Sequence, residues 1–130
     1  MTEIESILLI DNSEIDNFIN HKILEAHRVT NIVSFKSADT ALTFLLKTNI
    51  KFQFILVDIH LPIMDGFEFI DKFNELGLHK SQGQICLLSA SLNPFHKIQS
   101  EKLDVRFIEK PLTIEKLLIQ KFIMIYCNWM

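Results

Sequence analysis

Short apolar runs alternate with segments of helical periodicity along the whole chain. Five mostly apolar runs of four residues have the length and composition of strands buried on both faces of a parallel sheet. The five runs are residues 7–10, 32–35, 54–57, 85–88 and 105–108.

A segment in which apolar residues recur at helical spacing follows each of these runs. Ser13 and Asp65 are residue types that cap helix N-termini, and Thr113 stands where the last helix should open. Pro94 suits a first helical turn, and Gly77 suits a helix end. In the first helix the apolar positions are Ile15, Phe18, Ile19, Ile23 and Ala26.

Five such strand–helix units with short connections predict an α/β fold, in which helices cover both faces of a doubly wound parallel sheet. The 130 residues suit one domain, and 48% of them are apolar, which is enough for a packed core. We therefore expect residues 1–130 to form a single domain.

Charge and cysteine content exclude several classes of protein. A net charge of −3 and a pI of about 5.9 leave no broad basic surface, so nucleic-acid binding is not expected. Cys86 and Cys127 lie in apolar runs, which is typical of a reduced intracellular chain. Because neither a signal peptide nor a segment of membrane-spanning length is evident, we expect a cytoplasmic location without membrane insertion.

Polar residues with compatible chemistry follow four of the five predicted strands. In open α/β sheets the carboxyl ends of the strands meet at one edge, where sites form. Carboxylate and amide oxygens suit magnesium, and an aspartate can form an aspartyl phosphate. A hydroxyl and an ammonium group can bind phosphoryl oxygens. The residues in question are Asp11, Asn12, Asp58, Ser89, Lys110 and the Pro111 that follows it.

Four segments at these strand ends resemble the signature segments of receiver domains from two-component response regulators, in both order and spacing. They are LLIDNSEID, ILVDIHLPIMDG, LLSAS and FIEKP, and together they span almost the whole chain. The second is the most specific, because Pro62, Asp65 and Gly66 follow Asp58. The resemblance implies a flavodoxin-like (βα)5 fold with strand order 2-1-3-4-5. It also implies a stand-alone signalling switch without an output domain, not an enzyme.

The resemblance implies that Asp58 is the phosphoacceptor of a phosphorelay. Its phosphoryl group would come from a sensor histidine kinase or a histidine phosphotransfer protein. Mg²⁺, or Mn²⁺ in its place, would be held by Asp11, Asn12, Asp58 and the backbone carbonyl of His60.

The resemblance assigns the phosphoryl contacts and the switch to the last two strands. Ser89 and Lys110 would bind the phosphoryl oxygens, and Pro111 would support the lysine. The ring of Phe107 would follow the movement of Ser89. A downstream protein would then bind the face formed by the fourth helix, the fifth strand and the fifth helix.

Asn12 departs from the family pattern, because the second residue of the pair after the first strand is usually a carboxylate. An amide oxygen can still coordinate magnesium, but it adds no charge. We therefore expect weaker metal binding than in a receiver with two acids there.

Other interpretations of these residues stay open at the level of sequence. Asp58 could cap a loop, Lys110 could be a surface lysine, and Phe107 could be ordinary core. Asn12 could be a residue at the start of the first helix and not a metal ligand. The domain would then be a pseudo-receiver that binds partners without phosphorylation. A phosphatase of the haloacid dehalogenase type is disfavoured, because His60 stands where that reaction needs a second acid. A flavodoxin-like cofactor binder is disfavoured by the lack of a phosphate-binding loop after the first strand.

The last predicted helix carries two apolar stripes at about 100° per residue. We expect one stripe to pack on the sheet and the other to form a partner or homodimer surface, unless it is additional core. The first stripe is Ile114, Leu118, Phe122, Ile125 and Trp129, and the second is Ile119, Ile123, Tyr126 and Met130.

Overall fold

A five-stranded parallel sheet forms the centre of the protein. The computed structural model describes residues 4–90 and 93–129, the last four of them by their backbone only. The strand order β2-β1-β3-β4-β5 confirms the predicted topology. The strands are β1 (Ser6–Ile10), β2 (Asn31–Phe35), β3 (Phe54–Asp58), β4 (Gln84–Ser89) and β5 (Arg106–Glu109).

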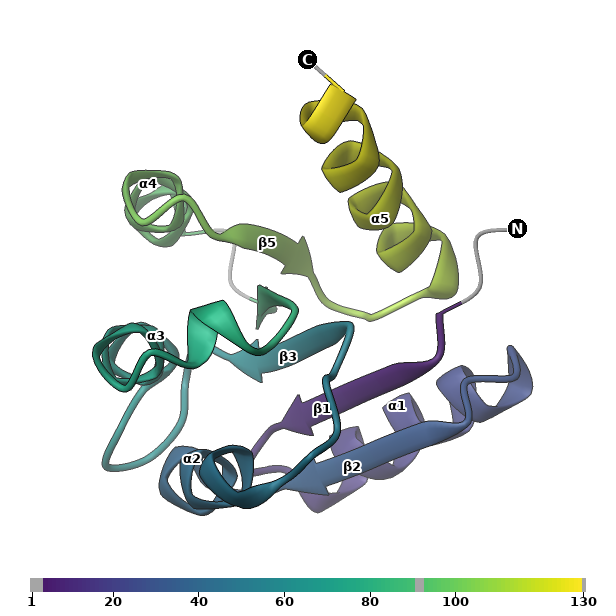
Figure 1. Ribbon diagram of the computed structural model, residues 1–130, viewed down its shortest axis with the longest axis horizontal. Helices are drawn as coiled ribbons and strands as arrows, with labels where there is room; N and C mark the ends of the chain where they lie inside the picture. Colours follow the sequence, from purple (N-terminus) through teal and green to yellow (C-terminus); the bar gives the residue numbers. More distant parts are fainter. Residues whose placement is uncertain (1–3, 91–92, 130) are drawn as a thin grey trace.

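Helices connect the strands and cover the two faces of the sheet. Figure 1 shows α2, α3 and α4 along one side, with α1 and α5 on the other. The helices are α1 (Glu14–Ala26), α2 (Ala38–Lys47), α3 (Gly66–Glu75), the 3₁₀ turn η1 (Leu78–Lys80), α4 (Pro94–Lys102) and α5 (Ile114–Trp129). In the described part of the chain, no helix is both long and apolar enough to cross a membrane.

Alternate residues of each central strand enter two separate hydrophobic cores, because successive side chains point to opposite faces. Leu8 and Val57 belong to the core beneath α2 and α3. Leu9 and Leu56 belong to the core that Leu117 of α5 helps to close. Burial on both faces explains why these strands are continuous apolar runs rather than alternating ones.

The predicted helix boundaries rest on side-chain caps. Ser13 Oγ accepts a hydrogen bond from the Asp16 amide at 3.1 Å. Asp65 and Glu68 form a reciprocal capping box at the start of α3. Gly77 has a φ of 75°, the left-handed conformation in which glycine is least strained. These residues fix where α1 and α3 begin and where α3 ends.

Helix α1 turns its polar face inward, contrary to what its apolar spacing suggests. Asn17 and Leu24 are buried, whereas Phe18 is 61% exposed. Asn17 can be buried because its Nδ2 donates hydrogen bonds to the backbone oxygens of Asp11 at 2.8 Å and Phe35 at 3.4 Å. The outward residues Ile15, Phe18 and Ile19 are called the α1 stripe below.

Helix α5 packs on the sheet through a different line of residues from the predicted one. Ile114 and Leu118 contact the core as expected, but Leu117 is the most buried of the α5 side chains that the structure describes. Phe122 was expected to pack inward and is 58% exposed, and Ile125 is exposed as well. The contact line therefore runs through positions 117 and 124 rather than 122 and 125. Of the second stripe, Ile119 is exposed and Ile123 half-buried. The side chains at 126, 129 and 130 lie outside the described residues.

Gly66 lets the start of α3 press against the end of β3, so its replacement by alanine should destabilise the fold. An added Cβ would lie 2.8 Å from the Asp58 carbonyl oxygen and 2.9 Å from Ile59 Cα. We expect Gly66→Ala to lower the free energy of unfolding by about 1–3 kcal/mol, although alanine normally favours a helix. Urea unfolding measures the loss, and Asn74→Ala at an exposed position of the same helix is the control. Unchanged stability would contradict the close packing.

Candidate functional site

Three strand ends bring two carboxylates and an ammonium group together. Asp11 directly follows β1, Asp58 ends β3 and Lys110 directly follows β5. Lys110 Nζ lies 3.0 Å from Asp11 Oδ2 and 3.2 Å from Asp58 Oδ2. The convergence expected from the parallel topology is therefore present for these three residues.

A third carboxylate, which sequence reasoning missed, contacts the same ammonium group. Asp16 Oδ2 in the first turn of α1 lies 3.3 Å from Lys110 Nζ. Its only signal in the sequence is its place in the segment LLIDNSEID, five residues after Asp11. We call these four residues, Asp11, Asp16, Asp58 and Lys110, the acid–lysine cluster.

Backbone hydrogen bonds hold the two inner carboxylates in place. The Ser13 amide donates to Asp11 Oδ1 at 2.9 Å, and the His60 amide donates to Asp58 Oδ1 at 3.1 Å. The other oxygen of each carboxylate therefore faces Lys110. Donation to one oxygen leaves the second free to bind a cation.

The pKa shifts in the cluster show how burial and charge compete. Burial raises the pKa of Asp11, and the hydrogen bond from Ser13 and the charge of Lys110 offset this only in part. Burial alone would lower the pKa of Lys110, but its bonds to Asp11 and the charge of Asp58 outweigh it, so that pKa is raised. Lys110 is therefore firmly charged near neutral pH, while burial still disfavours the charged form of Asp11.

The donor atoms around the cluster fit a hard divalent cation. The Lys110 ammonium already occupies a cation position between the oxygens of Asp11 and Asp58. Among the described residues no group of three or more His, Cys, Asp or Glu is arranged to hold a metal. Two carboxylates would thus need further oxygens, and the Asn12 amide and the His60 carbonyl are of the kind that Mg²⁺ accepts.

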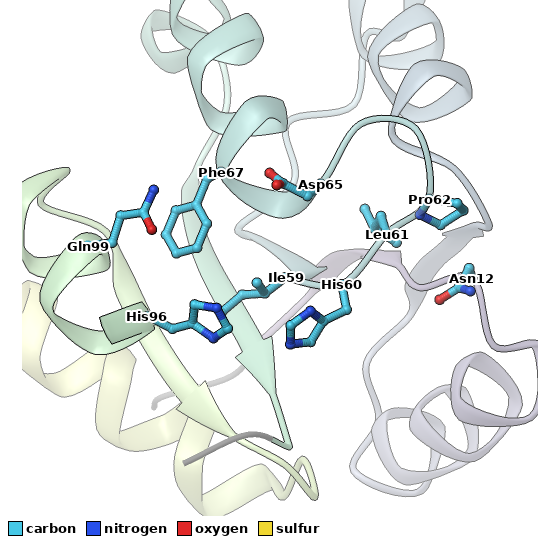
Figure 2. A pocket seen from close by; sticks show the side chains of 9 residues that line it. All are labelled: Asn12, Ile59, His60, Leu61, Pro62, Asp65, Phe67, His96 and Gln99. Carbon is cyan, nitrogen blue, oxygen red and sulfur yellow. The ribbon is translucent and has the colours of Figure 1, made fainter. Parts of the chain in front are cut away.

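A pocket of about 590 Å³ adjoins the cluster on the side of the β3–α3 loop. Figure 2 shows Asn12, His60 and Pro62 among the side chains that line it. The Asn12 and His60 side chains are exposed. The His60 ring lies against His96 of α4, with ring centroids 5.2 Å apart. The loop after Asp58 is therefore in direct contact with α4.

The remaining predicted residues lie at the ends of β4 and β5. Ser89 is fully buried at the end of β4, and its carbonyl accepts a hydrogen bond from the Lys110 amide at 2.9 Å. Phe107 is half-buried and packs against the core beneath α2 and α3. Pro111 is exposed and joined to Lys110 by a cis peptide bond.

Comparisons with known proteins agree with this arrangement. The family model described as response regulator receiver domain matches residues 7–121. Two-component response regulator 24 of Arabidopsis thaliana is 28% identical over 112 residues, which are 85% of this chain and 77% of that protein. A two-component response regulator from Cytophaga hutchinsonii is 36% identical in its crystal structure, with a TM-score of 0.80, 92% of this chain covered and 96% of that one.

A further solved structure shares the fold at lower identity. It is the receiver domain of the histidine kinase CKI1 from Arabidopsis thaliana, complexed with Mg²⁺ and BeF3⁻. The identity is 18% and the TM-score 0.76, with 90% of this chain and 88% of that chain covered.

The strand order and the acidic site at the strand ends define a flavodoxin-like α/β protein of the receiver type. Because the family match covers most of the chain, the protein belongs to the response regulator receiver domain family. Receiver domains are signalling switches rather than enzymes in the usual sense.

Removal of the Lys110 charge should destabilise the protein more without a divalent cation than with one. Lys110→Met leaves Asp11 and Asp58 buried without their ammonium partner, which should cost about 2 kcal/mol in EDTA. Added Mg²⁺ should recover much of this loss, because it can take the place of the ammonium. Urea unfolding with and without Mg²⁺ measures both terms, and Lys72→Met in an exposed ion pair is the control. Equal losses in both conditions would mean that these carboxylates bind no cation.

Proposed function

We propose that the protein is a phosphorylation switch that accepts a phosphoryl group on Asp58 in the presence of Mg²⁺. The observation that carries this proposal is the contact of Asp58 Oδ2 with Lys110 Nζ at 3.2 Å, beside a second buried carboxylate. Asp58 Oδ2 is a carboxylate nucleophile that lies beside a cation. The relative crystallised with Mg²⁺ supports the choice of metal.

Each residue of the site has a distinct part in the transfer. A carboxylate oxygen of Asp58 forms a bond to phosphorus while the bond from phosphorus to the donor's histidine nitrogen breaks, and that nitrogen keeps the electron pair. Bound Mg²⁺, held by Asp11, Asn12, Asp58 and the His60 carbonyl, would neutralise charge on the transferring group. Lys110 would place its ammonium group beside the phosphoryl oxygens.

The switch follows from contacts that the phosphoryl group adds. Ser89 is buried at the neighbouring strand end, and its hydroxyl would gain a phosphoryl oxygen as a partner. Such a differential contact can shift a two-state equilibrium. Phe107 on β5 and the His60–His96 contact on α4 are the two routes by which the change would reach the surface.

A downstream partner or a second copy of the chain would bind the α4–β5–α5 face. This face carries exposed apolar residues that the fold does not need for its core. They are Phe95, Ile98, Ile119, Phe122 and Ile125.

The pseudo-receiver remains the second candidate, because the exposed Asn12 brings no charge to the metal site. In that case the fold would bind partners without accepting a phosphoryl group. Phosphorylation of the parent protein decides between the two.

Incubation with acetyl phosphate and Mg²⁺ should add the mass of one phosphoryl group to the parent protein. Asp58→Asn should abolish the addition, because an amide oxygen is a poor nucleophile. Asp71→Asn, a change of the same kind at an exposed site on α3, should label like the parent. Intact-mass spectrometry checks all three. Full labelling of Asp58→Asn would place the phosphoacceptor elsewhere, and no labelling of the parent would favour the pseudo-receiver.

The α1 stripe is the surface best placed to receive the phosphodonor protein. The donor's histidine has to reach Asp58, so the donor must cover the carboxyl ends of the strands. Helix α1 begins at this edge, where Asp16 in its first turn contacts Lys110. Its outward apolar residues Ile15, Phe18 and Ile19 are exposed and could be buried against a helix of the partner.

The double change Ile15→Ser with Phe18→Ser should slow phosphotransfer from a histidine-phosphorylated donor about tenfold or more. Labelling by acetyl phosphate should be unaffected, because the small donor needs no docking surface. Ile119→Ser with Phe122→Ser is the matched control, since it removes the same two residue types at the same spacing from α5. A transfer rate lowered only by the α5 pair would place the donor on α5 instead.

A further inference from the structure

We infer that Asp16 is a positioning residue that retains Lys110 at the site when a divalent cation takes over Asp11 and Asp58. This inference rests on the proposed function, because it concerns the same metal and the same phosphoacceptor. Its basis is the third contact of the ammonium group, 3.3 Å from Asp16 Oδ2.

The Lys110 ammonium and Mg²⁺ compete for the same oxygens. Lys110 Nζ contacts Oδ2 of both inner carboxylates, the atoms that face away from the Ser13 and His60 amides. A divalent cation bound to these oxygens would strongly repel the Lys110 ammonium group at contact distance. Metal binding therefore requires Lys110 to move.

Asp16 is placed to accept the displaced ammonium group. The side chains of Asp11 and Asp58 are only 3% and 10% exposed, whereas that of Asp16 is 43% exposed. Asp16 thus lies at the mouth of the site, outside the expected set of metal ligands but within reach of Lys110. The Ser13 cap on its amide fixes where its backbone stands.

Asp16 also restores charge that Asn12 does not supply. Asp11, Asp16 and Asp58 carry three negative charges against the single positive charge of Lys110. Without Asp16, the lysine would pair only with the two inner carboxylates and would compete more strongly with the metal. Asp16 should therefore raise Mg²⁺ affinity through Lys110, not as a ligand.

Calorimetric titration with Mg²⁺ tests this inference through a double-mutant cycle. Asp16→Asn should weaken Mg²⁺ binding about fivefold, because Lys110 then pairs only with the two inner carboxylates and competes more strongly with the metal. The same change should have no further effect in a Lys110→Met background, where no ammonium competes. Asp16→Glu should restore most of the affinity, because it keeps a carboxylate within reach of Lys110.

Glu14→Gln is the matched control for Asp16→Asn. Glu14 is an acid in the same first turn of α1, so its loss removes the same helix charge, but it pairs with Lys36. Its Mg²⁺ affinity should equal that of the parent.

Three results would overturn the inference, and two of them would leave the proposed function intact. Parent-like Mg²⁺ affinity for Asp16→Asn would reduce Asp16 to a surface acid. Persistent weakening in the Lys110→Met background would show that Asp16 acts on the metal directly. Failure of the parent to bind Mg²⁺ would reject the proposed function and the role of Asp16 with it. The first two results, in a parent that binds Mg²⁺ and is phosphorylated, would reject the role of Asp16 alone.

Discussion

Two buried carboxylates that repel each other need a cation between them, and the rest of the site is arranged around this need. Asp11 and Asp58 are brought together by the pairing of β1 with β3. Lys110 reaches them from the far edge of the sheet, which requires β4 and β5 to be in place as well. The contact of one ammonium group with two carboxylates therefore depends on the pairing of four of the five strands.

The same contact makes the site responsive. Burial raises the pKa of Asp11, and the Lys110 ammonium group does not fully offset the cost of burying that carboxylate. A divalent cation or a phosphoryl group at this site would change the local charge, and Lys110 would have to move in response. Under the proposed function, the contacts of Ser89 and His60 with neighbouring elements would carry that change into β5 and α4. Under the proposed function, a cation or a phosphoryl group that arrives at this site would shift the fold between two states.

The apolar runs predicted the parallel sheet, and the resemblance to receiver domains supplied its strand order. Asp11, Asp58 and Lys110 converge as the parallel order requires. Periodicity was less informative for helices: it shows which residues share a face, not which face is buried. Asn17 is buried because it bonds to the backbone of Asp11 and Phe35, a tertiary contact that no local pattern contains. The contact of Asp16 with Lys110 joins residues 94 positions apart and could not be foreseen for the same reason.

The outward apolar residues of α1 also affect how copies of the protein behave toward one another. Isoleucine and phenylalanine side chains that stay in water attract similar surfaces on other molecules. At neutral pH the net charge of −3 keeps copies apart by mutual repulsion. Near the pI of about 5.9 that repulsion vanishes while the apolar attraction remains. The exposed helix face should therefore make concentrated solutions of this protein most prone to self-association near that pH.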